Sequence, residues 1–257
     1  MKHLAIVQID DQLNLAPGEQ RSDGLAPSKL AGRRLAAKPL IEWLVRRVSE
    51  AELIDGIAVV MPDAPQYREL ASLIPLDIPC HFSAKSTPLA RLAEASAEYP
   101  SNSIVRVPLE TPFCDPVLID RLLTAALQHQ QKDYIGYSLE DGSPACRSNI
   151  GLFAEWIRSS ALAKAAREVK AKEDAFRINS SFLEYPELFQ LETLPVPQSL
   201  NRNDLRFSVA NEDDWEELLA IVDVLGTETP EWQDMVRIID GQPTMRDRMA
   251  RRNRVVA

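Results

Sequence analysis

The chain has 257 residues, of which 45% are hydrophobic and 26% are charged, and its formal net charge is −9. This composition is typical of a globular protein with one large domain, and the acidic charge argues against nucleic-acid binding, which needs clustered Lys and Arg. Three widely spaced cysteines argue against a disulfide framework or a zinc site. The N-terminal apolar run is too short for a signal peptide and no segment is long enough to span a membrane, so we expect a cytoplasmic protein without membrane attachment.

The first 138 residues alternate between apolar strand patterns and amphipathic helix patterns. Strands are predicted at 4–9, 56–61, 78–82, 104–107 and 134–138, and helices at 39–52, 67–74, 88–98 and 117–130. This alternation predicts βαβ units and therefore a three-layer α/β fold with a mainly parallel sheet. Residues 10–29 are polar and contain two Pro and two Gly, which predicts a long loop of the kind that is usually functional.

The second half of the chain has a different pattern. Residues 154–172 are rich in Ala and predict a helix, 205–209 predict a late strand, and 213–224 predict an amphipathic helix. Beyond Gly226 the chain is polar, and its basic run at 246–254 is predicted to solvate a terminal helix.

One carboxylate stands where a ligand site is expected. Glu110 follows the predicted strand at 104–107, and ligands of open α/β sheets bind at the carboxyl ends of strands. A carboxylate there can hold a metal ion that is bound to phosphates, whereas the alternative is a solvated loop acid. Asp115 is predicted to cap the next helix because Pro116 follows it.

Basic residues offer a second signal. Lys29, Arg33 and Lys38 are close in sequence beside the long loop of an acidic chain, which favours an anion site over a solvated basic patch. For Arg91 and Arg106, a structural ion pair and a role in the site remain equally open.

Several segments together resemble the cytidylyltransferases that make CMP-activated acidic sugars. The family's S-x-R-L-P-G-K and G-K-P-L are similar to residues 28–33 and 37–40, and its D-x-L-x-R-Y is echoed at 88–92. Its V-R-I-T-G-D-C-P-L-I-D-P-x-L-I-D is similar to 105–120, and its L-R-W-T-V-D-T-P-E-D-L to 205–215. The likeness is strongest to the spore-coat polysaccharide biosynthesis protein F (SpsF) branch and more distant to CMP-KDO synthetase.

The resemblance implies a Rossmann-like nucleotide-diphospho-sugar transferase fold over residues 1–226, with a C-terminal helical appendage at 227–257. It implies that a sugar attacks the α-phosphate of CTP and releases pyrophosphate for surface polysaccharide biosynthesis, and it allows a homodimer. Lys29 and Arg33 would be the catalytic cations, and Mg²⁺ would be held by Glu110. The implied nucleotide-binding residues are Gln8, Ser28, Lys29, Gly32, Arg33, Lys38, Arg91 and Arg106.

Other positions depart from the family pattern. Asp10 stands where a phosphate-binding Arg belongs, and Ala210 stands where the family has its second metal carboxylate. Asn211 or Asp213 could replace that carboxylate, although Asp213 is expected to cap the following helix. In the sugar-facing segment at 149–153, two carboxylates of the family are absent. These departures leave open the alternative of a catalytically degenerate member that acts as a binding or assembly protein. A glycosyltransferase is disfavoured because no D-x-D metal motif occurs.

Overall fold

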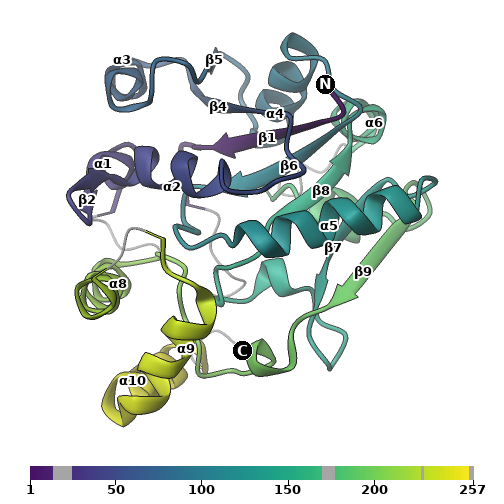
Figure 1. Cartoon of the computed structure of the whole chain (residues 1–257). Coiled ribbons are helices and arrows are strands. Elements are labelled where there is room, and N and C mark those ends of the chain that lie inside the picture. The colour runs from purple at the N-terminus through teal and green to yellow at the C-terminus, as the bar shows by residue number, and fades with distance from the viewer. Residues whose placement is uncertain (14–24, 170–176, 227–228, 255–257) are drawn as a thin grey trace.

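A computed structural model describes residues 1–13, 25–169, 177–226 and 229–254. Its centre is a seven-stranded sheet in the order β5-β4-β1-β6-β8-β7-β9, in which β8 alone runs against its neighbours (Figure 1). The strands are β1 His3–Gln8, β4 Gly56–Pro62, β5 Cys80–Ser83, β6 Ser103–Pro108, β7 Tyr134–Ser138, β8 Glu155–Arg158 and β9 Leu191–Pro195. The predicted α/β fold with a mainly parallel sheet is confirmed.

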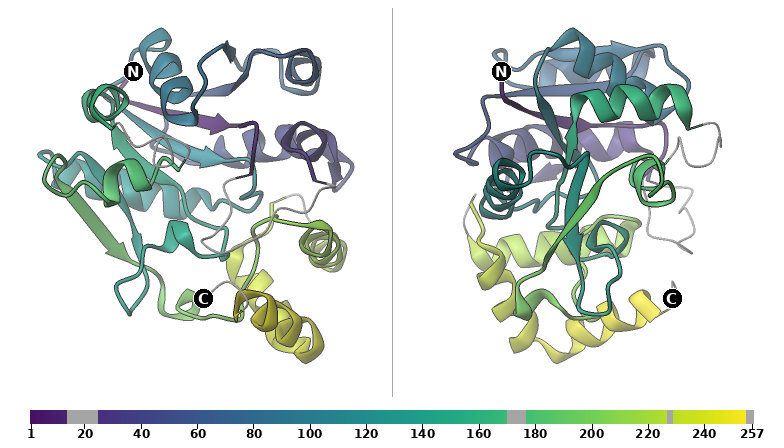
Figure 2. Two further views of the ribbon diagram at one scale, coloured as in Figure 1. Left: turned by 180° about the vertical axis from the view of Figure 1, so that it is seen from behind. Right: turned by 90° about the vertical axis from the view of Figure 1, so that its right-hand side faces the viewer.

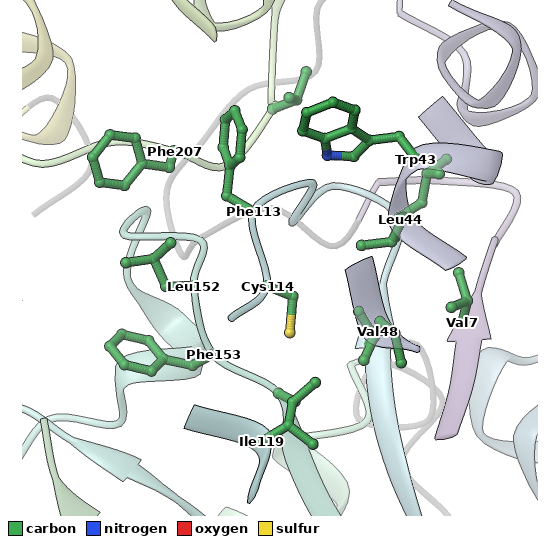
Figure 3. Packing of buried hydrophobic residues seen from close by; sticks show 14 of the residues in the cluster. Val7, Trp43, Leu44, Val48, Phe113, Cys114, Ile119, Leu152, Phe153 and Phe207 are labelled. Carbon is green, nitrogen blue, oxygen red and sulfur yellow. The ribbon is translucent and has the colours of Figure 1, made fainter. Parts of the chain in front are cut away.

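Helices cover both faces of this sheet, so that each face buries its own apolar cluster (Figure 2). The larger cluster lies under α2 (Leu40–Val48) and α5 (Pro116–Gln128), and Figure 3 shows part of it around Trp43, Phe113 and Phe207. The smaller cluster lies under α4 (Pro88–Glu98) and α6 (Ser159–Glu168). The other elements are α1 Pro27–Gly32, β2 Arg34–Leu35, β3 Lys38–Pro39, α3 Pro65–Arg68, α7 Ser180–Leu183, α8 Glu212–Leu225, α9 Trp232–Gly241, α10 Pro243–Arg254 and short 3₁₀ turns at Glu69–Leu73, Ala145–Arg147 and Gln198–Leu200.

Local signals explain where the helices begin. The Asp115 carboxylate accepts hydrogen bonds from the amides of Val117 and Leu118, so its predicted capping role is confirmed. The predicted cap at Asp213 is wrong, because the side chain of Asn211 accepts from the amide of Asp214 and begins α8 one residue earlier. Asn211 has the extended backbone that a capping residue needs.

The predicted helix at 154–172 is wrong at its start. Glu155–Arg158 form β8, which fills the slot between β6 and β7, and α6 begins only at Ser159. The last part of that prediction, 170–172, lies outside the described residues. Local sequence does not separate the two conformations here, because the sheet partners of β8 come from distant parts of the chain.

The predicted strand at 205–209 is also wrong. The amides of Phe207 and Ser208 donate to the carbonyl of Asn149, so this segment is anchored on a loop and joins no ladder. The sheet edge that sequence reasoning missed is β9, which pairs in parallel with β7. The predicted loop at 10–29 ends earlier than expected, because Pro27–Gly32 form α1, and its residues 14–24 lie outside the described part of the chain.

The C-terminal helices extend the larger core. Met235 and Ile239 of α9 and Met249 of α10 are fully buried in that cluster. Figure 1 shows α8, α9 and α10 along the edge at which the strand arrows of β1 and β7 end. The division at residue 226 stays a prediction. In the described part of the chain, no helix is long and apolar enough to cross a membrane.

Candidate active site

A polar network closes the smaller core at the carboxyl edge of β1 and β6. Arg106 lies opposite Glu155 in the ladder between β6 and β8, and Gln8 is the last residue of β1. Because side chains alternate along a strand, these residues share the sheet face of Ile6 and Ile104, which α4 covers. The network therefore lies between the sheet and α4.

Arg106 is the centre of this network and is buried. Its Nε donates to Gln8 Oε1 at 2.7 Å, and its Nη1 lies 2.5 Å from Glu155 Oε2. The hydroxyl of Tyr134 donates to the other oxygen of Glu155 at 2.7 Å. Burial opposes the charge of Arg106, but the carboxylates of Glu155 and Glu110 outweigh it and raise its pKa. These contacts indicate an ion-paired positioning role for Arg106, and its contact with a nucleotide stays a prediction.

Arg91 neutralises the acids at the start of the first loop. Its Nη2 lies 3.0 Å from Asp10 Oδ1, its Nη1 lies 3.0 Å from Asp11 Oδ2, and Nη1 also donates to the carbonyl of Lys85 at 2.9 Å. Burial raises the pKa of Asp10, against the influence of Arg91. An acid at this position is thus accommodated by an arginine from α4, 81 residues away in sequence. The nucleotide-binding role of Arg91 itself stays a prediction.

Glu110 and Ala210 lie side by side, as the motif alignment implies. The amide of Val209 donates to the carbonyl of Glu110 at 2.9 Å, and Glu110 and Ala210 line one small cavity of about 30 Å³ together with Arg106 and Ser208. A cavity of this size holds about one or two water molecules. Glu110 is buried and lines this small cavity just after the end of β6.

The two substitutes considered for the second carboxylate are engaged elsewhere. Asn211 caps α8, and the Asp213 side chain is 76% exposed, with its carboxylate 3.9 Å from Arg252. The neighbouring Asp214 accepts from the amide of Ala210 at 2.9 Å and binds Arg206 through both oxygens. Among the described residues, no group of three or more His, Cys, Asp or Glu could hold a metal. A divalent ion at Glu110 would therefore take its remaining ligands from water and from a bound phosphate.

The basic cluster borders the same region through α8. The guanidinium of Arg33 lies 2.5 Å from Glu212 and 4.7 Å from the centre of the Trp215 ring, at the start of α8. Ser28 is half-buried and Lys29 is exposed on α1, which Gly32 ends, and Lys38 is half-buried on β3. Lys38 follows two residues with left-handed backbone, Ala36 and Ala37 at φ 47° and 67°. Non-glycine residues in that conformation are strained, and such strain is typical of functional loops.

A larger cavity of about 970 Å³ opens beside the small one, at the carboxyl ends of β7 and β9. Ser148 and Asn149 line both cavities. Sequence reasoning did not single out Glu155, Tyr134 or Asn253 as site residues. Because the sequence predicts a helix over 154–172, no local signal marks Glu155 as a buried residue of a strand.

Comparisons with known proteins agree with this architecture. Residues 28–178, more than half of the chain, match the MobA-like NTP transferase domain. The uncharacterized protein MJ1063 of Methanocaldococcus jannaschii is 24% identical over 177 residues, which cover 68% of this chain and 69% of that protein.

Two solved structures share the fold. A cytidylyltransferase from Leptospira borgpetersenii superposes with a TM-score of 0.76 at 15% identity, over 95% of this chain and 96% of that one. CMP:2-keto-3-deoxy-manno-octonic acid synthetase complexed with CTP superposes with a TM-score of 0.61 at 10% identity, over 88% of this chain and 100% of that one. At these identities the likeness concerns the fold alone.

Proposed function

The chain belongs to the MobA-like NTP transferase family, and from this premise we propose that it is a nucleotidyltransferase that transfers CMP from CTP to a sugar for surface polysaccharide biosynthesis. The observation that carries the proposal is the position of Glu110, buried at the carboxyl end of β6 against Val209 and Ala210. Open α/β sheets bind their ligands at this edge. The fold shared with a cytidylyltransferase and with a synthetase that holds CTP supports CTP as the nucleotide.

In the proposed reaction, an oxygen of the sugar forms a bond to the α-phosphorus of CTP. The bond between that phosphorus and the oxygen bridging to the β-phosphate breaks, pyrophosphate leaves, and the proton of an attacking hydroxyl passes to water. Such a transfer depends on positioning and on neutralising the phosphate charge.

The residues of this chain divide that work. Lys29 and Arg33 would neutralise the phosphates, with Ser28, Gly32 and Lys38 on the same polar segment. Gln8, Arg91 and Arg106 would bind the nucleotide, held in place by the contacts of Gln8 and Arg91 with Asp10 and of Arg106 with Gln8. Glu110 supplies one carboxylate beside space for water, which supports Mg²⁺ as the ion, since Mg²⁺ usually binds at phosphates through one or two carboxylates and water. When bound, the ion would supply further neutralisation of phosphate charge.

A thermal-shift screen with the four nucleoside triphosphates and Mg²⁺ tests the proposal. A ligand at 100 times its Kd stabilises by about 2.7 kcal/mol. In a chain of this size each kcal/mol raises Tm by about 2–4 °C, so we expect CTP to raise Tm by about 5–10 °C. Pyrophosphate release from CTP and sugar should be lost in Glu110→Ala. The matched control is Glu69→Gln, which changes an exposed acid 41 positions before Glu110 in the sequence, and it should behave as the wild type.

A gain-of-ligand variant tests the metal. Ala210→Asp adds a second carboxylate beside Glu110. Without metal, the free energy of unfolding of this variant should be lower than that of the wild type, and Mg²⁺ should restore part of the difference. No Tm response to any of the four triphosphates would sink the enzyme proposal.

The alternative is a degenerate member that binds without catalysis, and Ala210 and the Asp10–Arg91 pair favour it. CTP binding without pyrophosphate release across a broad set of sugars would support that alternative.

A further inference from the structure

The cavity of about 970 Å³ has the size and position of an acceptor site. Small-molecule sites usually occupy about 300–1,000 Å³. Leu139–Asp141 contribute to it just after β7, residues 201–205 contribute after β9, and Asn253 contributes from α10. Ser148 and Asn149 line both this cavity and the small cavity at Glu110, so a molecule bound here would lie next to the proposed reaction centre.

The two cations that line this cavity are already paired. Arg202 lies 2.8 Å from Asp204 and 2.7 Å from Asp240, and the hydrogen bonds that it donates to these carboxylates raise the pKa of Arg202. Arg147 contacts Glu184 and donates to the hydroxyl of Ser180 at 3.3 Å. A carboxylate ligand would have to share these guanidinium groups with the acids that already bind them. The described lining is therefore a poor match for an acidic sugar.

Two acids of the lining, Glu140 and Asp141, have neutral partners, whereas Asp204 is bound by Arg202. Asn201 donates to Glu140 Oε2 at 2.7 Å, and the hydroxyl of Ser143 donates to Asp141 at 2.6 Å. Carboxylate and amide oxygens on the wall of an open cavity can accept further hydrogen bonds from hydroxyl groups. A neutral molecule rich in hydroxyls matches this set of acceptors.

Asn253 fixes α10 as one wall of the cavity. Its Nδ2 donates to the carbonyls of Asn203 at 2.9 Å and Leu205 at 3.0 Å, and its Oδ1 accepts from Arg206 at 3.1 Å. Asn149 also donates to Asn253 Oδ1 at 3.4 Å, and Ser208 donates to Asn149 at 3.1 Å. The terminal helix is thus connected by hydrogen bonds to the loop that lines both cavities.

We propose that this cavity is the acceptor site and that its acceptor is a neutral polyhydroxylated molecule, a sugar or sugar alcohol that attacks through a hydroxyl. The inference rests on the proposed function. The hydroxyl oxygen bonds to the α-phosphorus, pyrophosphate leaves, and the hydroxyl proton passes to water. Asn201 is a specificity-determining residue, and Asn253 is a positioning residue that shapes the cavity through α10. The chain thereby differs from enzymes whose acceptor is an acidic sugar.

The test compares neutral sugars and sugar alcohols with glucuronate, by thermal shift and by pyrophosphate release in the presence of CTP. Neutral acceptors should give at least tenfold more release than glucuronate. Asn201→Leu, which replaces a lining amide with an apolar group, should reduce release at least tenfold while the Tm shift caused by CTP is kept. Asp141→Lys, at an exposed position, should shift the preference toward glucuronate.

The outcomes separate the two proposals. A preference for glucuronate in the wild type, or full release in a folded Asn201→Leu variant, would overturn the acceptor proposal while the transferase function stands. A Tm shift with neutral polyols that is lost in Asn201→Leu, but without any response to CTP, would support the cavity and contradict the proposed function. Circular dichroism of Asn201→Leu and of the conservative variant Glu140→Gln shows whether each keeps the fold. Pyrophosphate release should fall less in Glu140→Gln than in Asn201→Leu.

Discussion

Replacement of Arg91 by Met should destabilise the protein by about 3–5 kcal/mol near pH 7, the usual cost of removing one partner of a buried ion pair. The Arg91 guanidinium lies 3.0 Å from both Asp10 and Asp11, and the Asp10 side chain is only 11% exposed. Met replaces the aliphatic stem of the side chain and removes its charge. The variant therefore leaves the Asp10 carboxylate buried without its nearest cation.

The loss should depend on pH in a defined direction. Burial already raises the pKa of Asp10 and Arg91 opposes that effect, so removing Arg91 raises the pKa further. A carboxyl group whose pKa is higher in the folded than in the unfolded state gives a stability that falls as pH rises through that interval. The deficit of Arg91→Met should therefore shrink as the pH is lowered from about 7 to about 5, because a protonated Asp10 needs no cation.

Urea unfolding of four proteins at several pH values measures this. The set is the wild type, Arg91→Met, Asp10→Asn and the double variant. The double variant should recover at least half of the loss, because an amide at position 10 carries no charge to be neutralised. A loss below about 1 kcal/mol, or one that is equal at all pH values, would refute the ion-pair argument. A stable Arg91→Met that has lost the Tm shift with CTP would instead identify Arg91 as a direct phosphate ligand.

Two further variants test the backbone around the site. Gly151→Ala should lower the free energy of unfolding by about 3 kcal/mol or more. A Cβ at φ 68° would lie 2.4 Å from the amide nitrogen of Ser208 and 2.6 Å from the carbonyl carbon of Phe207. An unchanged Tm would contradict this prediction. Ala37→Gly should raise the free energy of unfolding by about 0.5–1 kcal/mol, because relief of the left-handed strain at φ 67° outweighs the cost of the added entropy of the unfolded chain. A urea midpoint below that of the wild type would show that the turn is not strained.

Elements with strong local signals could be predicted to the residue. The helix at Pro88–Glu98 begins after Thr87, whose hydroxyl accepts from the amide of Ala90, and the strand at Tyr134–Ser138 has the predicted bounds. Capping residues and apolar periodicity act over a few positions, so they are visible in the sequence alone. By contrast, β8 is only four residues long and directly precedes the Ala-rich α6, and its place between β6 and β7 depends on strands that lie far away in sequence.

The candidate site shows the same division. The position of Glu110 after a buried strand could be predicted from the apolar pattern of 104–107, and its proximity to Ala210 from the family motifs at 105–120 and 205–215. The pairings of Arg106 with Glu155 and of Arg91 with Asp10 could not, because they join residues 49 and 81 positions apart. No local pattern identifies which acid a buried arginine will contact.

The sequence by itself determined the α/β alternation, the cap at Asp115 and the carboxylate at the end of β6, because each depends on neighbouring residues or on a motif carried in order along the chain. Only the tertiary structure decided that Arg91 compensates for an acid in the first loop and that Asn253 of α10 lines the larger cavity. These features depend on where distant segments meet, and burial then sets which charges are paired and which groups remain to bind a ligand.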